Sequence, residues 1–147
     1  MNDTDVRTAP AAPVLRRDAE GVFERAVAGG PAAPAALRRL AAARLRAWGL
    51  DAIAADVLLV VSELATNAVR ASGAGTLVGL RLMVWRAVLS VEVYDGSTAP
   101  AVPAPPPAVP EDAESGRGLA IVAALARHWG QRRDPDGKTV YALLDLP

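Results

Sequence analysis

The chain has 147 residues, enough for one domain with its own hydrophobic core, and 52% of its residues are apolar. Sixteen basic residues balance sixteen acidic ones, so the formal net charge is zero and the basic excess typical of nucleic-acid-binding proteins is missing. The chain has no cysteine, which excludes disulfides, thiolate metal sites and a cysteine nucleophile.

We expect no signal peptide at the start of this sequence. Residues 1–13 are polar and rich in Pro and Ala, without the apolar centre of a signal peptide. No apolar stretch reaches the roughly 20 residues that span a bilayer. We therefore expect a cytoplasmic protein that binds neither nucleic acid nor membrane. Residues 1–14 are expected to form a disordered tail, followed by one domain over residues 15–147.

The first half of the domain predicts one strand and two helices. A strand is expected at about residues 21–27, followed by a break at Gly29-Gly30-Pro31. Residues 35–48 carry apolar side chains at helical spacing and end at a glycine. Asp51 is expected to cap a longer helix that reaches about residue 71.

The second half begins with two segments rich in Val and Leu, residues 77–85 and 88–94, which predict a β-hairpin. Residues 97–115 contain six prolines and predict an extended surface loop. A third helix is expected from residue 117 or 118 to 129, and a last strand over 138–146. This order indicates an α+β fold, with helices packed on one face of a mainly antiparallel sheet.

Glu63 and Asn67 form a polar pair in the second expected helix. They lie four residues apart, so they stack on one flank of an apolar stripe and are expected to be half-buried. A carboxylate and an amide one turn apart suit an acid/base group beside a Mg²⁺ ion bound through oxygen. Alternatively, Glu63 reaches water and Asn67 bonds nearby backbone, which is the commoner arrangement for such a pair alone.

Asp95-Gly96-Ser97 follows the second strand of the hairpin. An Asp at a strand end, with Gly next, can present a carboxylate to a ligand while the backbone stays close to it. The adenine amino group is a donor that such a carboxylate accepts. A plain Asp-Gly turn is the alternative.

Gly116-Arg117-Gly118 opens the third expected helix. Two glycines allow a ligand close to the backbone, the free N–H groups of a helix N-terminus attract anions, and Arg117 adds a charged fork for a phosphate. The spacing fits neither a Walker loop nor a dinucleotide fingerprint, and a helix start with a glycine hinge is the alternative. His128, the single histidine, is expected near the C-terminus of this helix in a structural role.

The order and spacing of these segments are more specific than any one of them. Together they resemble the GHKL superfamily of ATP-binding domains, which includes gyrase, histidine kinases and the mismatch-repair ATPase. Within it, the chain is most similar to small anti-sigma-factor serine/threonine kinases and the related regulatory ATP-binding proteins of actinobacteria. The resemblance covers about residues 22–146. Its motifs are an N-box at 61–68, a first glycine box at 95–97, a second at 116–119, and Gly137-Lys138-Thr139-Val140.

The resemblance implies a Bergerat-type two-layer α/β sandwich, with ATP between helices and sheet. Glu63 would be the general base, and Asn67 would hold a Mg²⁺ ion that bridges the phosphates. Asp95, with Gly96 beside it, would accept from the adenine amino group, and Thr139 would assist through a water molecule. The phosphates would contact the second glycine box, which consists of Gly116, Arg117, Gly118 and Leu119.

The Pro-rich segment 98–114 would be a lid over the nucleotide. This lid is heavily stiffened by proline, which departs from the family pattern, and the chain departs from it in two further places. The first glycine box has no later glycine, and Arg70-Ala71 stands where relatives often have Arg-His.

The function that the resemblance implies is an anti-sigma factor that phosphorylates an anti-anti-sigma partner and binds a sigma factor. Alternatives are a non-catalytic switch, in which ATP orders the lid and sets partner affinity, and an adaptor without nucleotide binding. Intact Glu63 and Asn67 favour the kinase over the adaptor. A stand-alone histidine kinase is not expected, because no dimerisation helix pair precedes the domain. Such relatives often pair, and residues 35–48 are the candidate interface of a homodimer.

Overall fold

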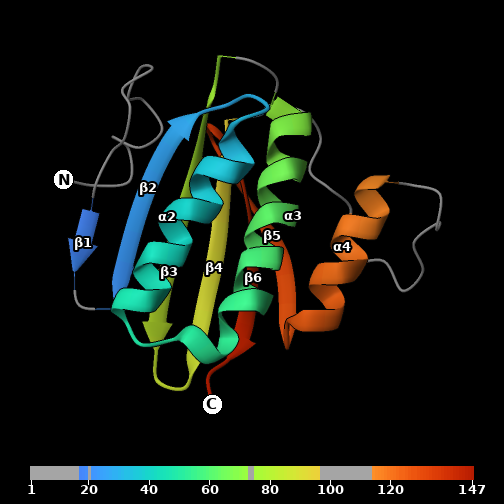
Figure 1. Cartoon of the computed structure of the whole chain (residues 1–147). Coiled ribbons are helices and arrows are strands. Elements are labelled where there is room, and N and C mark those ends of the chain that lie inside the picture. Colours follow the sequence, from blue (N-terminus) through green and yellow to red (C-terminus); the bar gives the residue numbers. More distant parts are fainter. Residues whose placement is uncertain (1–16, 20, 73–74, 97–113) are drawn as a thin grey trace.

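The computed structural model describes residues 17–19, 21–72, 75–96 and 114–147, with the backbone alone for 17–19 and 114–118. It shows a sheet in the order β1-β2-β3-β4-β6-β5, and every described pairing is antiparallel. The helices cover one face of this sheet (Figure 1). The elements in chain order are β1 (Arg17–Ala19), β2 (Val22–Ala28), α2 (Ala33–Ala47), the 3-10 turn η1 (Asp51–Ile53), α3 (Ala54–Ser72), β3 (Leu77–Trp85), β4 (Val88–Asp95), α4 (Glu114–Leu125), β5 (His128–Asp134) and β6 (Gly137–Asp145). The predicted α+β sandwich, with helices on one face of an antiparallel sheet, is confirmed.

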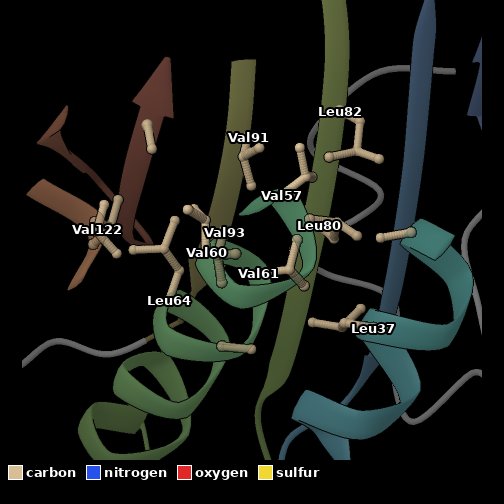
Figure 2. Close-up of a cluster of buried hydrophobic side chains, with 14 of the residues drawn as sticks. Leu37, Val57, Val60, Val61, Leu64, Leu80, Leu82, Val91, Val93 and Val122 are labelled. Atoms are coloured by element: carbon tan, nitrogen blue, oxygen red, sulfur yellow. The ribbon is translucent and has the colours of Figure 1, made fainter. Parts of the chain in front are cut away.

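Helix α3 forms the centre of the core. Its apolar stripe faces the sheet, and each side chain of that stripe is at most 2% exposed. Leu80 and Leu82 of β3 and Val91 and Val93 of β4 pack beneath it, as Figure 2 shows. Figure 1 places α2 on one side of α3 and α4 on the other. The stripe consists of Val57, Val60, Val61, Leu64, Ala65 and Ala68.

The segment Asp51–Ser72 is long and apolar enough to cross a membrane by length and composition alone. Core helices of globular domains pass the same test, and the buried side chains of α3 pack against the sheet. We therefore interpret α3 as a core helix.

Helix α2 follows the expected pattern. Pro34 stands in its first turn, where a missing N–H costs nothing, and the buried residues Leu37, Ala41 and Leu45 recur every four positions. The helix ends before Gly49, whose φ of 71° allows the left-handed conformation that closes a helix. Asp51, in contrast, does not cap α3 as expected. It lies within η1, which has Leu50 at its N-cap and no side-chain cap bond.

The last third of the domain corrects two further predictions. Helix α4 begins at Glu114 and ends at Leu125, and His128–Asp134 forms strand β5 instead of a helix end. His128 is therefore not at a helix C-terminus. Gly130, expected just past the helix, pairs with Tyr141 of β6, and a Cβ there would meet the Tyr141 hydroxyl at 2.6 Å. The predicted tail over residues 1–14 and almost all of the predicted lid over 98–114 lie outside the described residues.

Candidate functional site

Glu63 and Asn67 lie on the flank of α3 that faces α4. The other flank faces α2, because Arg38 Nη1 of α2 donates to Ser62 Oγ at 3.0 Å. Ser62 is one residue, about 100° of helical rotation, away from Glu63. Both Glu63 and Asn67 are half-buried, as their position beside the apolar stripe predicts.

Asn67 carries a buried donor without a hydrogen bond. Its Nδ2 atom is shielded from solvent and has no hydrogen-bond partner among the described residues. An unsatisfied buried polar group costs about 1–3 kcal/mol, so the Asn67 amide calls for a partner that a water, an ion or a ligand can supply. Because amide nitrogen and oxygen are interchangeable by a flip, the same group suits either a phosphate oxygen or a cation.

Asp95 is the last residue of β4 and points to the helix-covered side, in step with Val91 and Val93. Its neighbour in β3 is Val78. Helix α3 ends at Ser72 and the chain re-enters the sheet at Leu77, so Asp95 and the C-terminal part of α3 lie at the same end of the sheet. The structure thus brings the Asn67 and Asp95 segments together.

Lys138 of β6 is the direct cross-strand neighbour of Asp95. Its Nζ atom lies 3.4 Å from Asp95 Oδ2, and both side chains are 1% exposed. The two atoms form an ion pair by distance but lack the geometry of a hydrogen bond, so Lys138 Nζ has no hydrogen-bond partner. No role was predicted for Lys138 from the sequence, although it belongs to the motif Gly137-Lys138-Thr139-Val140. Its signal was strand periodicity, because Lys138 shares the alternation of the buried Val140, Ala142 and Leu144.

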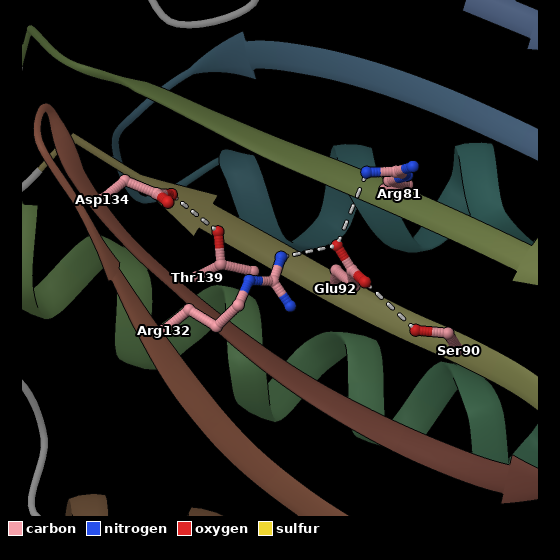
Figure 3. A network of polar contacts seen from close by, with 6 residues as sticks. All are labelled: Arg81, Ser90, Glu92, Arg132, Asp134 and Thr139. Carbon is pink, nitrogen blue, oxygen red and sulfur yellow. Dashed lines mark hydrogen bonds and ion pairs between the residues drawn. The ribbon is translucent and has the colours of Figure 1, made fainter. Parts of the chain in front are cut away.

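Thr139 lies on the other face of the sheet. Its Oγ1 donates to Asp134 Oδ2 at 3.3 Å, and Figure 3 shows both residues on the face that the helices leave open. Successive residues of a strand point to opposite faces, so Thr139 cannot share a face with Lys138. The structure therefore does not bring Thr139 to Asp95, contrary to the role expected for it.

The open face carries a polar network of its own. Glu92 of β4 contacts Arg132 Nη2 at 3.2 Å and Arg81 Nη1 at 3.9 Å, and accepts from Ser90 Oγ at 3.3 Å (Figure 3). These residues join strands β3, β4 and β5, whereas Asn67, Asp95 and Lys138 lie on the opposite, helix-covered side.

The second glycine box lies in the first turns of α4. Gly116, Arg117 and Gly118 are described by their backbone, and the buried Leu119 and Val122 anchor the helix in the core. In Figure 1 the N-terminal end of α4 is at the same end of the sheet as the C-terminal end of α3. The N–H groups of a helix N-terminus there suit an anion.

Gly137 is required where β6 starts beside Asp95. A Cβ at this position would collide with the Asp95 carbonyl oxygen and come within 2.9 Å of the Gly96 Cα. The absence of a side chain therefore lets β6 approach the end of β4, which brings Lys138 beside Asp95.

The donor set fits a nucleoside triphosphate with a magnesium ion. The described residues contain no group of three His, Cys, Asp or Glu side chains placed to hold a metal. Mg²⁺ needs no such group, since it usually takes one or two protein ligands together with phosphate oxygens and waters. The buried Asn67 amide meets that requirement, because it lies on the flank of α3 that faces α4, whose N-terminus suits an anion.

Comparison with known proteins gives a family. A family model described as a histidine kinase-like ATPase domain matches residues 28–143. The matched range runs from the end of β2 into β6 and includes the N-box, both glycine boxes and the β6 motif. No curated protein matches the chain.

Proposed function

Because the chain belongs to the histidine kinase-like ATPase domain family, we propose that it is a cytoplasmic regulatory protein that binds ATP where α3, β4 and α4 meet. One observation carries this proposal. The family's three segments converge at one end of the sheet, and the Asn67 amide there is buried without a hydrogen bond. A bound nucleotide with its metal would supply the missing partner.

Every predicted site residue except Thr139 has a role in this proposal. Asn67 would hold Mg²⁺, which offsets the negative charge of the phosphates. Asp95 would accept from the adenine amino group, and Gly96 keeps the adjoining backbone free of a side chain. The first turns of α4 would face the phosphates through Gly116, Arg117, Gly118 and Leu119.

The activity proposed is that of a serine/threonine kinase. Glu63 lies one turn before Asn67 on the same flank, so it would accept the proton of a partner's hydroxyl group beside the phosphates. The partner proposed is an anti-anti-sigma protein, with a sigma factor as the second protein bound. In this proposal the chain is an anti-sigma factor, and it phosphorylates the anti-anti-sigma protein that acts against it.

A non-catalytic switch is the second candidate. It is favoured by the ion pair between Lys138 and Asp95, which engages the carboxylate proposed for adenine, and by the missing later glycine of the first glycine box. In this case ATP changes the affinity for the regulatory partner without phosphate transfer.

Transfer of labelled γ-phosphate to a candidate anti-anti-sigma protein separates the two. A kinase predicts that Glu63→Ala lowers the transfer rate about 10²- to 10⁴-fold, because the general base is lost. The matched control is Asp56→Ala, an exposed acidic residue in the first turn of α3, which should leave the rate unchanged. Equal transfer by the wild type and Glu63→Ala would contradict the kinase, and ATP binding without any transfer would favour the switch.

A further inference from the structure

The buried cation beside Asp95 has no role in the proposed function. We propose that Lys138 reads the base of the nucleotide: its ammonium group donates a hydrogen bond to the ring nitrogen beside the amino group of adenine, while Asp95 accepts from that amino group. This proposal rests on ATP binding at the site described above. It makes Lys138 a specificity-determining residue for adenine.

The placement of the two side chains supports this pairing. Lys138 and Asp95 are cross-strand neighbours on β6 and β4, and both point to the helix-covered side. Their charged atoms are 3.4 Å apart. A lysine ammonium is only a donor and a carboxylate only an acceptor, so the pair presents one donor beside one acceptor.

The ammonium group of Lys138 has no hydrogen-bond acceptor within the part of the chain that the structure describes. It has three hydrogens to donate, its side chain is 1% exposed, and its one charged contact does not have hydrogen-bond geometry. The next residues along the same face of the two strands, Val93 and Val140, are apolar and offer no acceptor from their side chains. A buried ammonium group is stable only when its charge is paired and its hydrogens are bonded, so this arrangement calls for an acceptor from a ligand.

Adenine has the complementary pattern. Its amino group is a donor, and a ring nitrogen acceptor lies beside it on either edge, at N1 or at N7. Guanine has a carbonyl oxygen at the position of the amino group, so the same pose would place an acceptor against the Asp95 carboxylate. Where water is excluded, an unmatched polar group stays unpaired, and discrimination is therefore strong.

The test compares the affinities of the full chain for ATP, 1-deaza-ATP and 7-deaza-ATP by calorimetry. One analogue should bind the wild type about ten- to a hundredfold more weakly than ATP, because it lacks the acceptor for Lys138, and it identifies the ring nitrogen. In Lys138→Met the same analogue should bind as well as ATP. Arg132→Met, which removes a cation from the open face, should keep the wild-type preference.

Each result decides the proposal. Equal affinity of the wild type for ATP and both analogues would overturn it, as would a preference that persists in Lys138→Met. If Lys138→Met does not fold, the double variant Lys138→Met/Asp95→Asn removes both buried charges and should bind the three nucleotides equally. A wild type that binds none of them would overturn the proposed function itself, which is a different outcome from binding without discrimination.

Discussion

The energetics of Lys138 and Asp95 follow from their burial. Two opposite charges at 1% exposure lose their hydration, and their ion pair offsets part of that cost. Removing one partner leaves the other charge buried without this ion pair, whereas removing both leaves neither charge of the pair to compensate. The two residues are therefore coupled in the free energy of unfolding, apart from any role with a ligand.

We predict that Lys138→Met lowers the free energy of unfolding by about 3–5 kcal/mol. Lys138→Met/Asp95→Asn should recover most of this loss, because no isolated charge remains. Urea unfolding of the wild type, both single variants and the double variant gives the coupling energy. Additive effects of the two single substitutions would show that the ion pair does not contribute.

For single residues, the sequence predicted which helix positions are half-buried better than it predicted the face of the sheet to which a strand side chain points. The half-buried flank of Glu63 and Asn67 followed from helical geometry, and both side chains are half-buried. Thr139 was the wrong choice beside Asp95, because a shift of one residue in a strand moves the side chain to the other face. Only the register of β6 against β4 shows that Lys138 occupies that place.

At the scale of the elements, Glu92 links strands on the open face of the sheet. We expect it to contribute more to stability than the exposed ion pair between Arg127 and Asp145. The side chain of Glu92 is 12% exposed and contacts two arginines, Arg81 of β3 and Arg132 of β5. The pair between Arg127 and Asp145, in contrast, lies in solvent with side chains 55% and 67% exposed. Surface ion pairs of the second kind contribute little.

We predict that Glu92→Gln lowers the free energy of unfolding by about 1 kcal/mol, less at high salt because the two arginines are partly exposed. Asp145→Asn is the matched control, and its effect should be too small to measure. Chemical unfolding at low and high salt provides both comparisons. A loss as large for Asp145→Asn as for Glu92→Gln would contradict the role given to the network.

Elements with a clear periodicity were predicted well, and those with mixed signals were not. The hairpin was placed almost to the residue, since Arg86-Ala87 separates two segments rich in Val and Leu. Strand β5 was missed because Trp129 continues the apolar spacing of Val122 and Leu125 in α4. Gly130 then supplies a glycine that resembles a helix end. Pairing with β6, a tertiary contact, determines its conformation.

At the scale of the whole molecule, the two-layer arrangement could be predicted because three amphipathic helices and an antiparallel hairpin allow few other packings. The convergence of α3, β4 and α4 could be expected only from the resemblance, since no spacing along the chain reports which ends of distant elements meet. The strand order, with β6 between β4 and β5, places Lys138 beside Asp95. The residues next to Lys138 and Asp95 in the sequence do not predict that the two side chains meet.

The central claim is that this end of the sheet binds ATP through Asn67, and calorimetry with Mg·ATP tests it most directly. The wild type should bind. Asn67→Ala should bind at least about tenfold more weakly, because the buried amide that would hold the metal and its nucleotide is lost. Thr66→Ala, one position along α3 and turned away from α4, should bind like the wild type. No heat from the wild type, or equal affinity of the wild type and Asn67→Ala, would contradict the claim.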